Sequence, residues 1–186
     1  MIAIMSAALV EILLRFATRE QHLTARRTLF RADDPVRHLH IVTSGVVRLT
    51  RALVRGGELT LQRAASGQIL AEASIFAERY HCNARAVEKS TICSVPIRKL
   101  HAAIENDVHL NAALMRHLAH ELQRTRAQSE ILALKTISER IRAWKSLNGG
   151  TLPPKGQWHT LATHIGVSPE ALYRELARMR STRRTL

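Results

Sequence analysis

The feature that most constrains this chain lies near its C-terminal end, at the Gly-Val-Ser-Pro corner of residues 166–169. Two short amphipathic runs meet at this corner, and the second run carries arginines away from its apolar stripe. Ser168 is a good helix cap, and Pro169 fits the first turn of a helix without losing a needed N–H group. The pattern over residues 161–176 predicts a helix-turn-helix, which places its second helix in the major groove of DNA.

The charge of the chain favours the same kind of partner. The 186 residues, 46% of them hydrophobic, suffice for one large or two small domains, and the formal net charge is +13. From Arg140 to the end there are nine basic and two acidic residues, a net charge of +7. Such an excess indicates a polyanionic partner, although a basic solvated surface is the alternative.

The N-terminus and the cysteines indicate the cellular compartment in which the protein is expected. Residues 1–10 are apolar but lack a basic leader, and Glu11 and Arg15 interrupt the run before it could span a bilayer. We therefore expect a small docking helix there. Two cysteines, Cys82 and Cys93, do not make a disulfide framework, so a reducing cytoplasm is expected.

The middle of the chain predicts short strands with no helices between them. Within residues 25–97 they are expected at 39–47, 46–54, 59–64, 69–70, 83–87 and 91–95. The last two are expected to pair with each other around residues 88–90, which leaves Cys82 and Cys93 too far apart for a disulfide. Strands at this spacing favour an antiparallel barrel or sandwich.

From about Asp107 the hydrophobic period changes to that of a helix. Alternating three- and four-residue steps predict a seam for helix pairing at Met115, Leu118, Leu122, Thr125, Ser129 and Leu132. Thr125 and Ser129 weaken this seam, and a single core helix is the alternative. Thr136 and Glu139 form a capping box that predicts a further helix to about Leu147.

Several motifs together resemble the Crp/Fnr family of bacterial transcription regulators. Residues 29–35 and 39–49 are similar to the opening of a cyclic-nucleotide-binding β-roll, and Gly56-Gly57-Glu58 is similar to its hairpin. Residues 67–76 resemble the strand and turn that lead into the nucleotide pocket. Their order, followed by the helix-turn-helix, extends the resemblance over roughly residues 10–180.

This resemblance implies an α+β fold in three parts. Residues 1–106 would form an antiparallel, jelly-roll-like β-roll that acts as sensor, residues 107–135 a dimerisation helix, and residues 136–186 the helix-turn-helix domain. Family members continue into a small β-wing, which we expect to be reduced or missing here. The implied protein is a cytoplasmic homodimer that binds double-stranded DNA, with RNA polymerase as a further partner.

The sequence departs from the family pattern at the effector pocket. In nucleotide-binding members, a Gly-Glu turn and an arginine followed by a small hydroxyl residue hold the ligand. Here Ala71 replaces the glycine, and Cys82 and Asn83 replace the arginine and the hydroxyl residue. A thiol cannot supply the charged fork that arginine offers a phosphate, so control by cyclic AMP is not expected. The predicted pocket comprises Glu72, Arg79, His81, Cys82 and Asn83.

Three roles are open for His81 and Cys82. They can be a structural pair in the barrel, they can ligate haem or a metal, as in haem-based sensors of the family, or Cys82 can be a redox-sensing thiol. The last role would need Arg79 and Arg85 to lower the pKa of the thiol. Adjacent strand residues point to opposite faces, which disfavours a shared metal. The sequence leaves the cofactor unknown.

The recognition helix keeps part of the base-reading pattern of the family. Arg-Glu-x-x-x-Arg becomes Pro169-Glu170-x-x-x-Arg174, so Glu170 is expected at cytosine N4 and Arg174 at guanine O6 and N7. Tyr173 is expected at a thymine methyl or a phosphate. The predicted DNA-binding residues are Ser168, Pro169, Glu170, Tyr173, Arg174 and Arg178. Phosphate contacts, or else a solvated helix face, are expected of Arg178, Arg180, Arg183 and Arg184.

The sequence therefore predicts a DNA-binding regulator. The alternative is a module that senses haem, redox state or another small effector, and whose shortened C-terminal part binds protein instead of DNA. No nucleophile–base pair, phosphate-cradling glycine loop or metal triad occurs at a usable spacing, so an enzyme is not expected.

Overall fold

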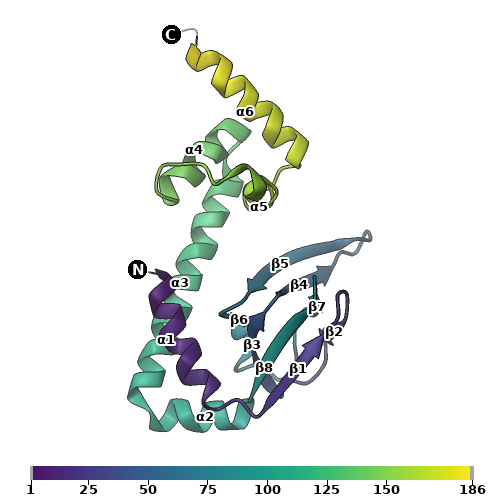
Figure 1. Ribbon diagram of the computed structural model, residues 1–186, viewed down its shortest axis with the longest axis vertical. Helices are drawn as coiled ribbons and strands as arrows, with labels where there is room; N and C mark the ends of the chain where they lie inside the picture. Colours follow the sequence, from purple (N-terminus) through teal and green to yellow (C-terminus); the bar gives the residue numbers. More distant parts are fainter. Residues whose placement is uncertain (1, 185–186) are drawn as a thin grey trace. The chain divides into compact units, whose positions relative to one another are not determined.

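The computed structural model describes residues 2–184, with side chains described over residues 7–180. The chain divides into two compact units, residues 1–118 and 119–186. Each unit has a hydrophobic core of its own. The first unit is built on antiparallel sheet and the second is helical, which confirms the predicted α+β class (Figure 1).

The first unit is a β-roll of two four-stranded antiparallel sheets. One has the strand order β1-β8-β3-β6 and the other β2-β7-β4-β5. The strands are β1 Arg19–Leu23, β2 Thr28–Phe30, β3 His38–Ser44, β4 Val46–Ala52, β5 Glu58–Ala65, β6 Gln68–Leu70, β7 Asn83–Ala86 and β8 Ser90–Pro96. The six expected strands correspond to β3–β8, whereas β1 and β2 were missed. Strand β1 has one buried residue, Leu23, among its five, and β2 is three residues long.

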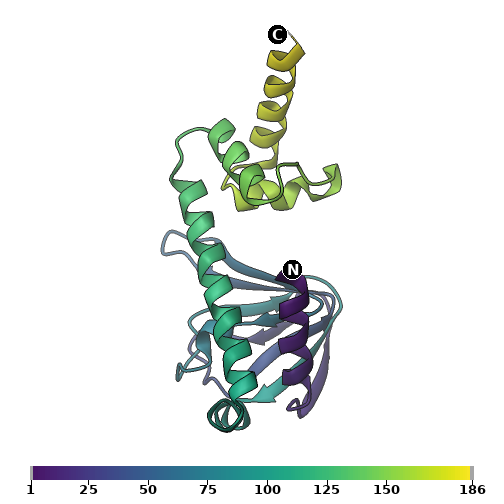
Figure 2. The same ribbon diagram turned by 90° about the vertical axis from the view of Figure 1, so that its left-hand side faces the viewer.

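Strand β3 shows how the sheet separates two cores. Leu39 and Ile41 pack against helices α1 (Ile2–Leu14), α2 (Ile97–Asn106) and the beginning of α3 (Val108–Ala133). Val42 lies on the opposite face of β3 and packs between the two sheets, because successive side chains of a strand point to opposite faces. Figure 2 shows α1 and the beginning of α3 side by side over the sheet. The expected N-terminal docking helix is thus present, with Leu9 and Leu13 fully buried.

The expected pairing of the last two strands was wrong. Strand β7 pairs with β2 and β4, whereas β8 pairs with β1 and β3, so the two lie in different sheets. The turn between them crosses from one layer to the other, which short-range patterns do not reveal. Both Cys82 and Cys93 are free thiols.

Two helices follow β8. The sequence did not predict α2, whereas the helix expected from about Asp107 is present as α3. Asp107 caps it, because its Oδ1 accepts hydrogen bonds from the backbone N–H groups of His109 and Leu110 at 2.9 and 3.0 Å. No helix in the described part of the chain is long and apolar enough to cross a membrane.

The second unit contains the end of α3 and three further α-helices. They are α4 Ile137–Leu147, α5 Trp158–His164 and α6 Pro169–Arg184, with a short 3-10 turn at Lys155–Gln157 before α5. The predicted capping box is present, because Thr136 and Glu139 each bond the other's backbone N–H. Among the residues that the structure describes, no strand follows α6.

Candidate nucleic-acid interface and effector pocket

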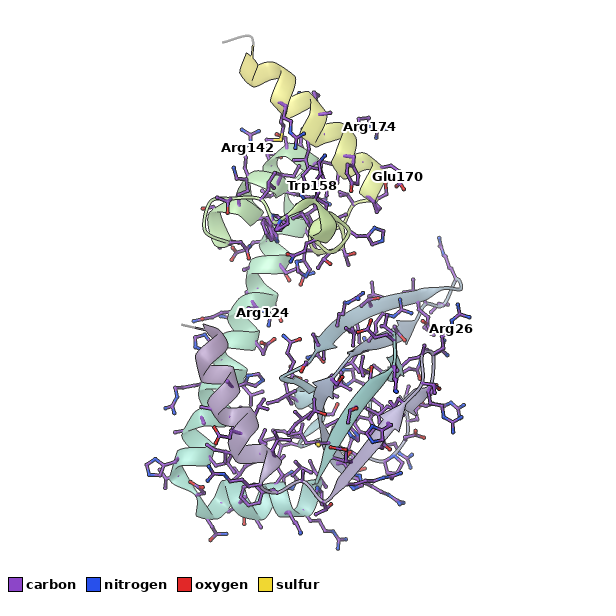
Figure 3. The ribbon with its side chains drawn as sticks, viewed as in Figure 1. Arg26, Arg124, Arg142, Trp158, Glu170 and Arg174 are labelled. Atoms are coloured by element: carbon purple, nitrogen blue, oxygen red, sulfur yellow. The ribbon has the colours of Figure 1, made fainter. Side chains whose placement is uncertain are left out.

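Helix α6 separates a buried face from an exposed charged face. Leu172 and Leu176 are buried in the core of the second unit, and Met179 packs against it. Glu170 and Arg174 are exposed, and Figure 3 shows their side chains extending from the same side of α6. The predicted orientation of this helix is therefore confirmed.

Ser168 holds the N-terminal end of α6. Its Oγ accepts a hydrogen bond from the backbone N–H of Ala171 at 3.2 Å, the geometry of an N-cap. The carboxylate of Glu170 lies in the same first turn, where hydrogen bonds from its own backbone N–H and from Ser168 lower its pKa. Glu170 is thus ionised at neutral pH and available as an acceptor.

The turn between α5 and α6 is fixed by an arginine of α4. Arg140 donates from Nε to the carbonyl of Leu134 at 2.9 Å and from Nη1 to the carbonyl of Ile165 at 3.1 Å. Gly166 has a φ of +67°, and a Cβ there would lie 2.5 Å from Cδ2 of Leu132. The left-handed backbone and this close approach both favour glycine at the turn.

Tyr173, which was expected to contact DNA, also packs against another aromatic side chain of the same unit. Its side chain is half exposed, and its ring packs against the ring of Trp158 with centroids 5.1 Å apart. The guanidinium of Arg180 lies 5.6 Å from the centre of the same indole, a cation–π distance. This cluster braces α6 against α5, and Trp158 Nε1 is itself satisfied by the carbonyl of Pro153 at 2.9 Å.

The other arginines of α6 differ in their surroundings. Arg178 makes a two-pronged ion pair with Glu175, at 2.9 Å from Nε and 2.6 Å from Nη2. A phosphate contact by Arg178 would have to compete with that carboxylate. The side chains of Arg183 and Arg184 lie outside the described residues. Exposed Arg174 makes no hydrogen bond or ion pair among the described side chains.

The predicted seam on α3 is exposed in part. Met115, Leu122 and Leu132 are exposed, whereas Leu118 packs against the core beneath the β-roll. Thr125 and Ser129 donate their hydroxyl protons to the carbonyls four residues earlier, at 2.9 and 3.0 Å. Their polar groups are therefore satisfied within the helix, which lowers the cost of covering them.

The predicted effector pocket is filled where the phosphate would lie. Cys82 is fully buried in the core between the sheets, together with Leu70 and Ala71. Burial raises the pKa of the thiol, and the charge of Arg51 offsets only part of this effect. A redox-sensing thiol activated by Arg79 and Arg85 is therefore contradicted, because desolvation outweighs the neighbouring charge.

The other four residues of this pocket are engaged elsewhere. The carboxylate of Glu72 accepts from Gln62 Nε2 at 3.2 Å, and Arg79 donates to the carbonyl of Asp33 at 2.6 Å. Asn83 Oδ1 accepts from the backbone N–H of Ala32 at 2.9 Å. His81 and Cys82 lie in the bend just before β7, where His81 is exposed and contacts Ser74 Oγ at 3.3 Å while Cys82 is buried. No metal-binding group of three His, Cys, Asp or Glu side chains occurs in the described part of the chain.

Comparison with known proteins agrees with this architecture. Residues 20–107 match the cyclic nucleotide-binding domain family. The chain is 26% identical over 113 residues to the transcriptional activator protein Anr of Pseudomonas aeruginosa, which covers 61% of this chain and 46% of that protein. The structure is similar to FixK2 from Bradyrhizobium japonicum, with a TM-score of 0.68 and 20% identity, covering 89% of this chain and 85% of that one. It is also similar to the c-di-GMP-responsive regulator CLP of Xanthomonas campestris, with a TM-score of 0.64 and 21% identity, covering 95% and 92%.

The chain has a Crp/Fnr-like fold, and the proteins it resembles are Crp/Fnr regulators. The resemblance inferred from its motifs is thereby confirmed. The chain spans about half the length of the curated relatives it matches, and those relatives are transcription regulators.

Within this Crp/Fnr fold, sequence reasoning missed the polar residues of the β-roll interior. His40 is buried between the sheets, with Nδ1 2.9 Å from Ser94 Oγ and Nε2 3.3 Å from Tyr80 Oη. A signal was available, because His38 and His40 are two apart on a strand and so lie on one face. Arg140 was missed as well, since its role depends on carbonyls 25 and 26 residues away.

Proposed function

We propose that this chain is a DNA-binding transcriptional regulator that acts as a homodimer and is not controlled by cyclic AMP. One observation carries the proposal. Glu170 and Arg174 project from the exposed face of a capped helix whose other face is locked into a helix-turn-helix core. Carboxylate and guanidinium groups four residues apart on one helix face can read neighbouring bases in a major groove.

The chemistry at Cys82 supports independence from cyclic AMP. A cyclic phosphate buried in the β-roll needs a cation, and the position offers an apolar thiol packed against Leu70 and Ala71. Ala71 keeps the left-handed backbone of the turn, with a φ of +59°, yet the carboxylate of Glu72 is already bonded to Gln62. A cyclic nucleotide would have to displace that bond and still lack a counter-ion.

Dimerisation is supported by exposed apolar side chains on α3. Met115 is 62% exposed and Leu122 52% exposed, and both belong to the seam predicted from the helical spacing of α3. A second copy of the same helix would cover them, and two recognition helices would then meet half-sites about one helical turn apart. An effector that favours one arrangement of the pair would control this match.

The test is fluorescence anisotropy with a randomised duplex library, at two salt concentrations, followed by selection of the bound sequences. We expect binding that weakens with salt and loses roughly one unit of the logarithmic salt slope for each phosphate-contacting cation removed. Selected duplexes should bind more tightly than the starting pool. Absence of salt-sensitive binding would contradict this function and favour a module that binds protein.

Dimerisation is tested by sedimentation velocity on the wild-type chain and a Leu122→Asp variant. We expect a dimer that the charge dissociates, since one carboxylate would be buried against its own copy. Leu53→Asp serves as the matched control, because Leu53 is similarly exposed but lies at the end of β4. Equal dissociation of both variants would contradict the seam on α3.

A further inference from the structure

A cavity of about 450 Å³ opens between the two sheets of the β-roll, and nothing in the family pattern accounts for it. Its wall includes β1, β3 and β8 of one sheet, β2 of the other, the segment that joins β2 to β3, and Tyr80. The residues that matter here are Arg19, Phe30, Arg37, His38, His40 and Tyr80. None of the residues at the cyclic-nucleotide position, 71, 72, 82 and 83, lines this cavity.

Three flat side chains form one wall of the cavity. The rings of Phe30 and Tyr80 are stacked, with centroids 3.7 Å apart and planes 12° apart, and Phe30 also stacks on His40 at 5.6 Å. All three residues are buried. Such a wall accepts the edge or face of another planar ring, because aromatic pairs gain energy beyond simple burial.

The polar groups in the wall form one directed chain of hydrogen bonds. Tyr80 Oη donates to the carbonyl of His38 at 2.6 Å, so it is an acceptor for His40 Nε2–H. His40 Nδ1 is then an acceptor for the hydroxyl of Ser94 at 2.9 Å. The chain is satisfied with His40 neutral, and burial lowers the pKa of that imidazole to about 3. The wall therefore brings no charge of its own.

The positive charge of the cavity comes from Arg19 and Arg37, which are exposed and also line it. Neither makes an ion pair among the described side chains. Asp34 is the one acidic residue in the lining, and its Oδ2 already accepts from the backbone N–H of Arg31 at 2.7 Å. The positive potential reaches His38, whose pKa is lowered first by burial and then by Arg19 and Arg37.

We propose that this cavity binds a planar aromatic monocarboxylate. The carboxylate would pair with Arg19 and Arg37, and the ring would lie against the wall formed by Phe30, His40 and Tyr80. A volume of about 450 Å³ falls in the range of small-molecule sites, and both polar and apolar groups line this open cavity. The proposal concerns binding by the β-roll alone and does not depend on whether the chain binds DNA.

The site is suited to transmit what it binds. His38 and His40 face the cavity, while Leu39 and Ile41 between and beside them pack on α1, α2 and the beginning of α3. A ligand that shifts β3 therefore acts on the opposite core directly. Occupancy of the cavity can in this way bias the helices that follow the β-roll.

The test is isothermal titration calorimetry of the full chain with benzoate, 1-naphthoate and indole-3-carboxylate. Their neutral carboxamides keep the ring but lack the negative charge, so they test whether the charge is needed. Inorganic phosphate has the charge but no ring, so it tests whether the ring is needed. We expect at least one carboxylate to bind. Its amide should bind about tenfold more weakly because it loses a charge-assisted hydrogen bond, and phosphate about tenfold more weakly because it lacks the ring contact. No binding by any of the three acids at millimolar concentration would overturn the proposal, as would equal binding of acid and amide or of acid and phosphate.

Variants locate the site. Arg19→Gln with Arg37→Gln should weaken carboxylate binding by about tenfold or more, whereas Arg63→Gln with Arg85→Gln should change it less than about twofold. The control removes the same charge from exposed positions outside the cavity lining. Arg37→Gln alone, at an exposed loop position, repeats the test if the double variant melts at a lower temperature. Unchanged affinity in both Arg37 variants would overturn the assignment.

Discussion

The β-roll has an uncharged side chain at its family ligand position, whereas the exposed face of α6 keeps a charged one. At the position where nucleotide-binding relatives have an arginine, the β-roll buries Cys82 among apolar neighbours and keeps the thiol un-ionised. At the α6 position that corresponds to a base-reading arginine in the family pattern, Arg174 stays exposed and unpaired among the described side chains. One site of the family pattern has been absorbed into the core, and the other remains open to a ligand.

The difference follows from what a charge costs in each place. A guanidinium between two sheets must be paired or it destabilises the fold by several kcal/mol, so a β-roll without a phosphate ligand is more stable without it. An arginine on a solvated helix face costs the fold almost nothing, and it is kept or lost according to what it binds. Exposed charge is therefore the better guide to function in this molecule.

The strongest test of the comparison is to return the arginine to the β-roll. Cys82→Arg should lower the free energy of unfolding by about 3 kcal/mol or more, because it buries an unpaired and oversized cation. Urea denaturation followed by circular dichroism measures the loss. Cys82→Ala is the matched control and should cost about 1 kcal/mol. A Cys82→Arg variant that unfolds like wild type and gains thermal stability from cyclic AMP would contradict a filled pocket.

The second neutral group in the β-roll is His40, and its effect on stability should become measurable at acidic pH. The pKa of His40 is about 3 in the folded chain against 6.5 ordinarily, so between these values the unfolded chain binds more protons. The free energy of unfolding should therefore fall as the pH drops below 6.5, by about 2 kcal/mol between pH 6.5 and 5.

Urea titrations at both pH values, on wild type and a His40→Gln variant, measure this contribution. The variant cannot titrate at this position, so its stability should depend less steeply on pH. Identical pH dependence in the two proteins would show that His40 is not buried neutral.

On α6 the same logic predicts a change in binding without a change in stability. Arg174→Ala should weaken binding to a selected duplex by about 1–3 kcal/mol while altering the free energy of unfolding by less than about 0.5 kcal/mol. Anisotropy and urea denaturation measure the two effects. Arg85→Ala, an exposed arginine on β7, is the control and should do neither. If both variants bind alike, Arg174 does not read DNA.

The smallest expected effect concerns the cap of the recognition helix. Ser168→Ala removes the acceptor for the Ala171 N–H and should cost about 1 kcal/mol in the second unit. Ser168→Asp keeps an acceptor and should retain most of that stability, which thermal denaturation can resolve. A loss of the same size in both variants would mean that the side chain does not act as the N-cap.

Local sequence was sufficient for the elements whose contacts are local. The capping box of Thr136 and Glu139, the cap at Ser168 and the buried positions Leu172 and Leu176 all follow from spacings of three or four residues. The strands from β3 to β6 followed from alternation and turn residues in the same way. These features need no information from distant parts of the chain.

Tertiary structure alone decided the rest, because the deciding partners are far apart in sequence. It placed β7 and β8 in different sheets, which corrected their expected pairing. It brought His40 within reach of Ser94 and Tyr80, 54 and 40 residues away, and set Arg140 against the turn at Ile165. The sequence by itself thus determined that the chain carries a β-roll and a helix-turn-helix. Which interior positions stay apolar, and where a cavity is left between the sheets, depended on how the two layers pack, since burial and pairing are properties of the assembled fold.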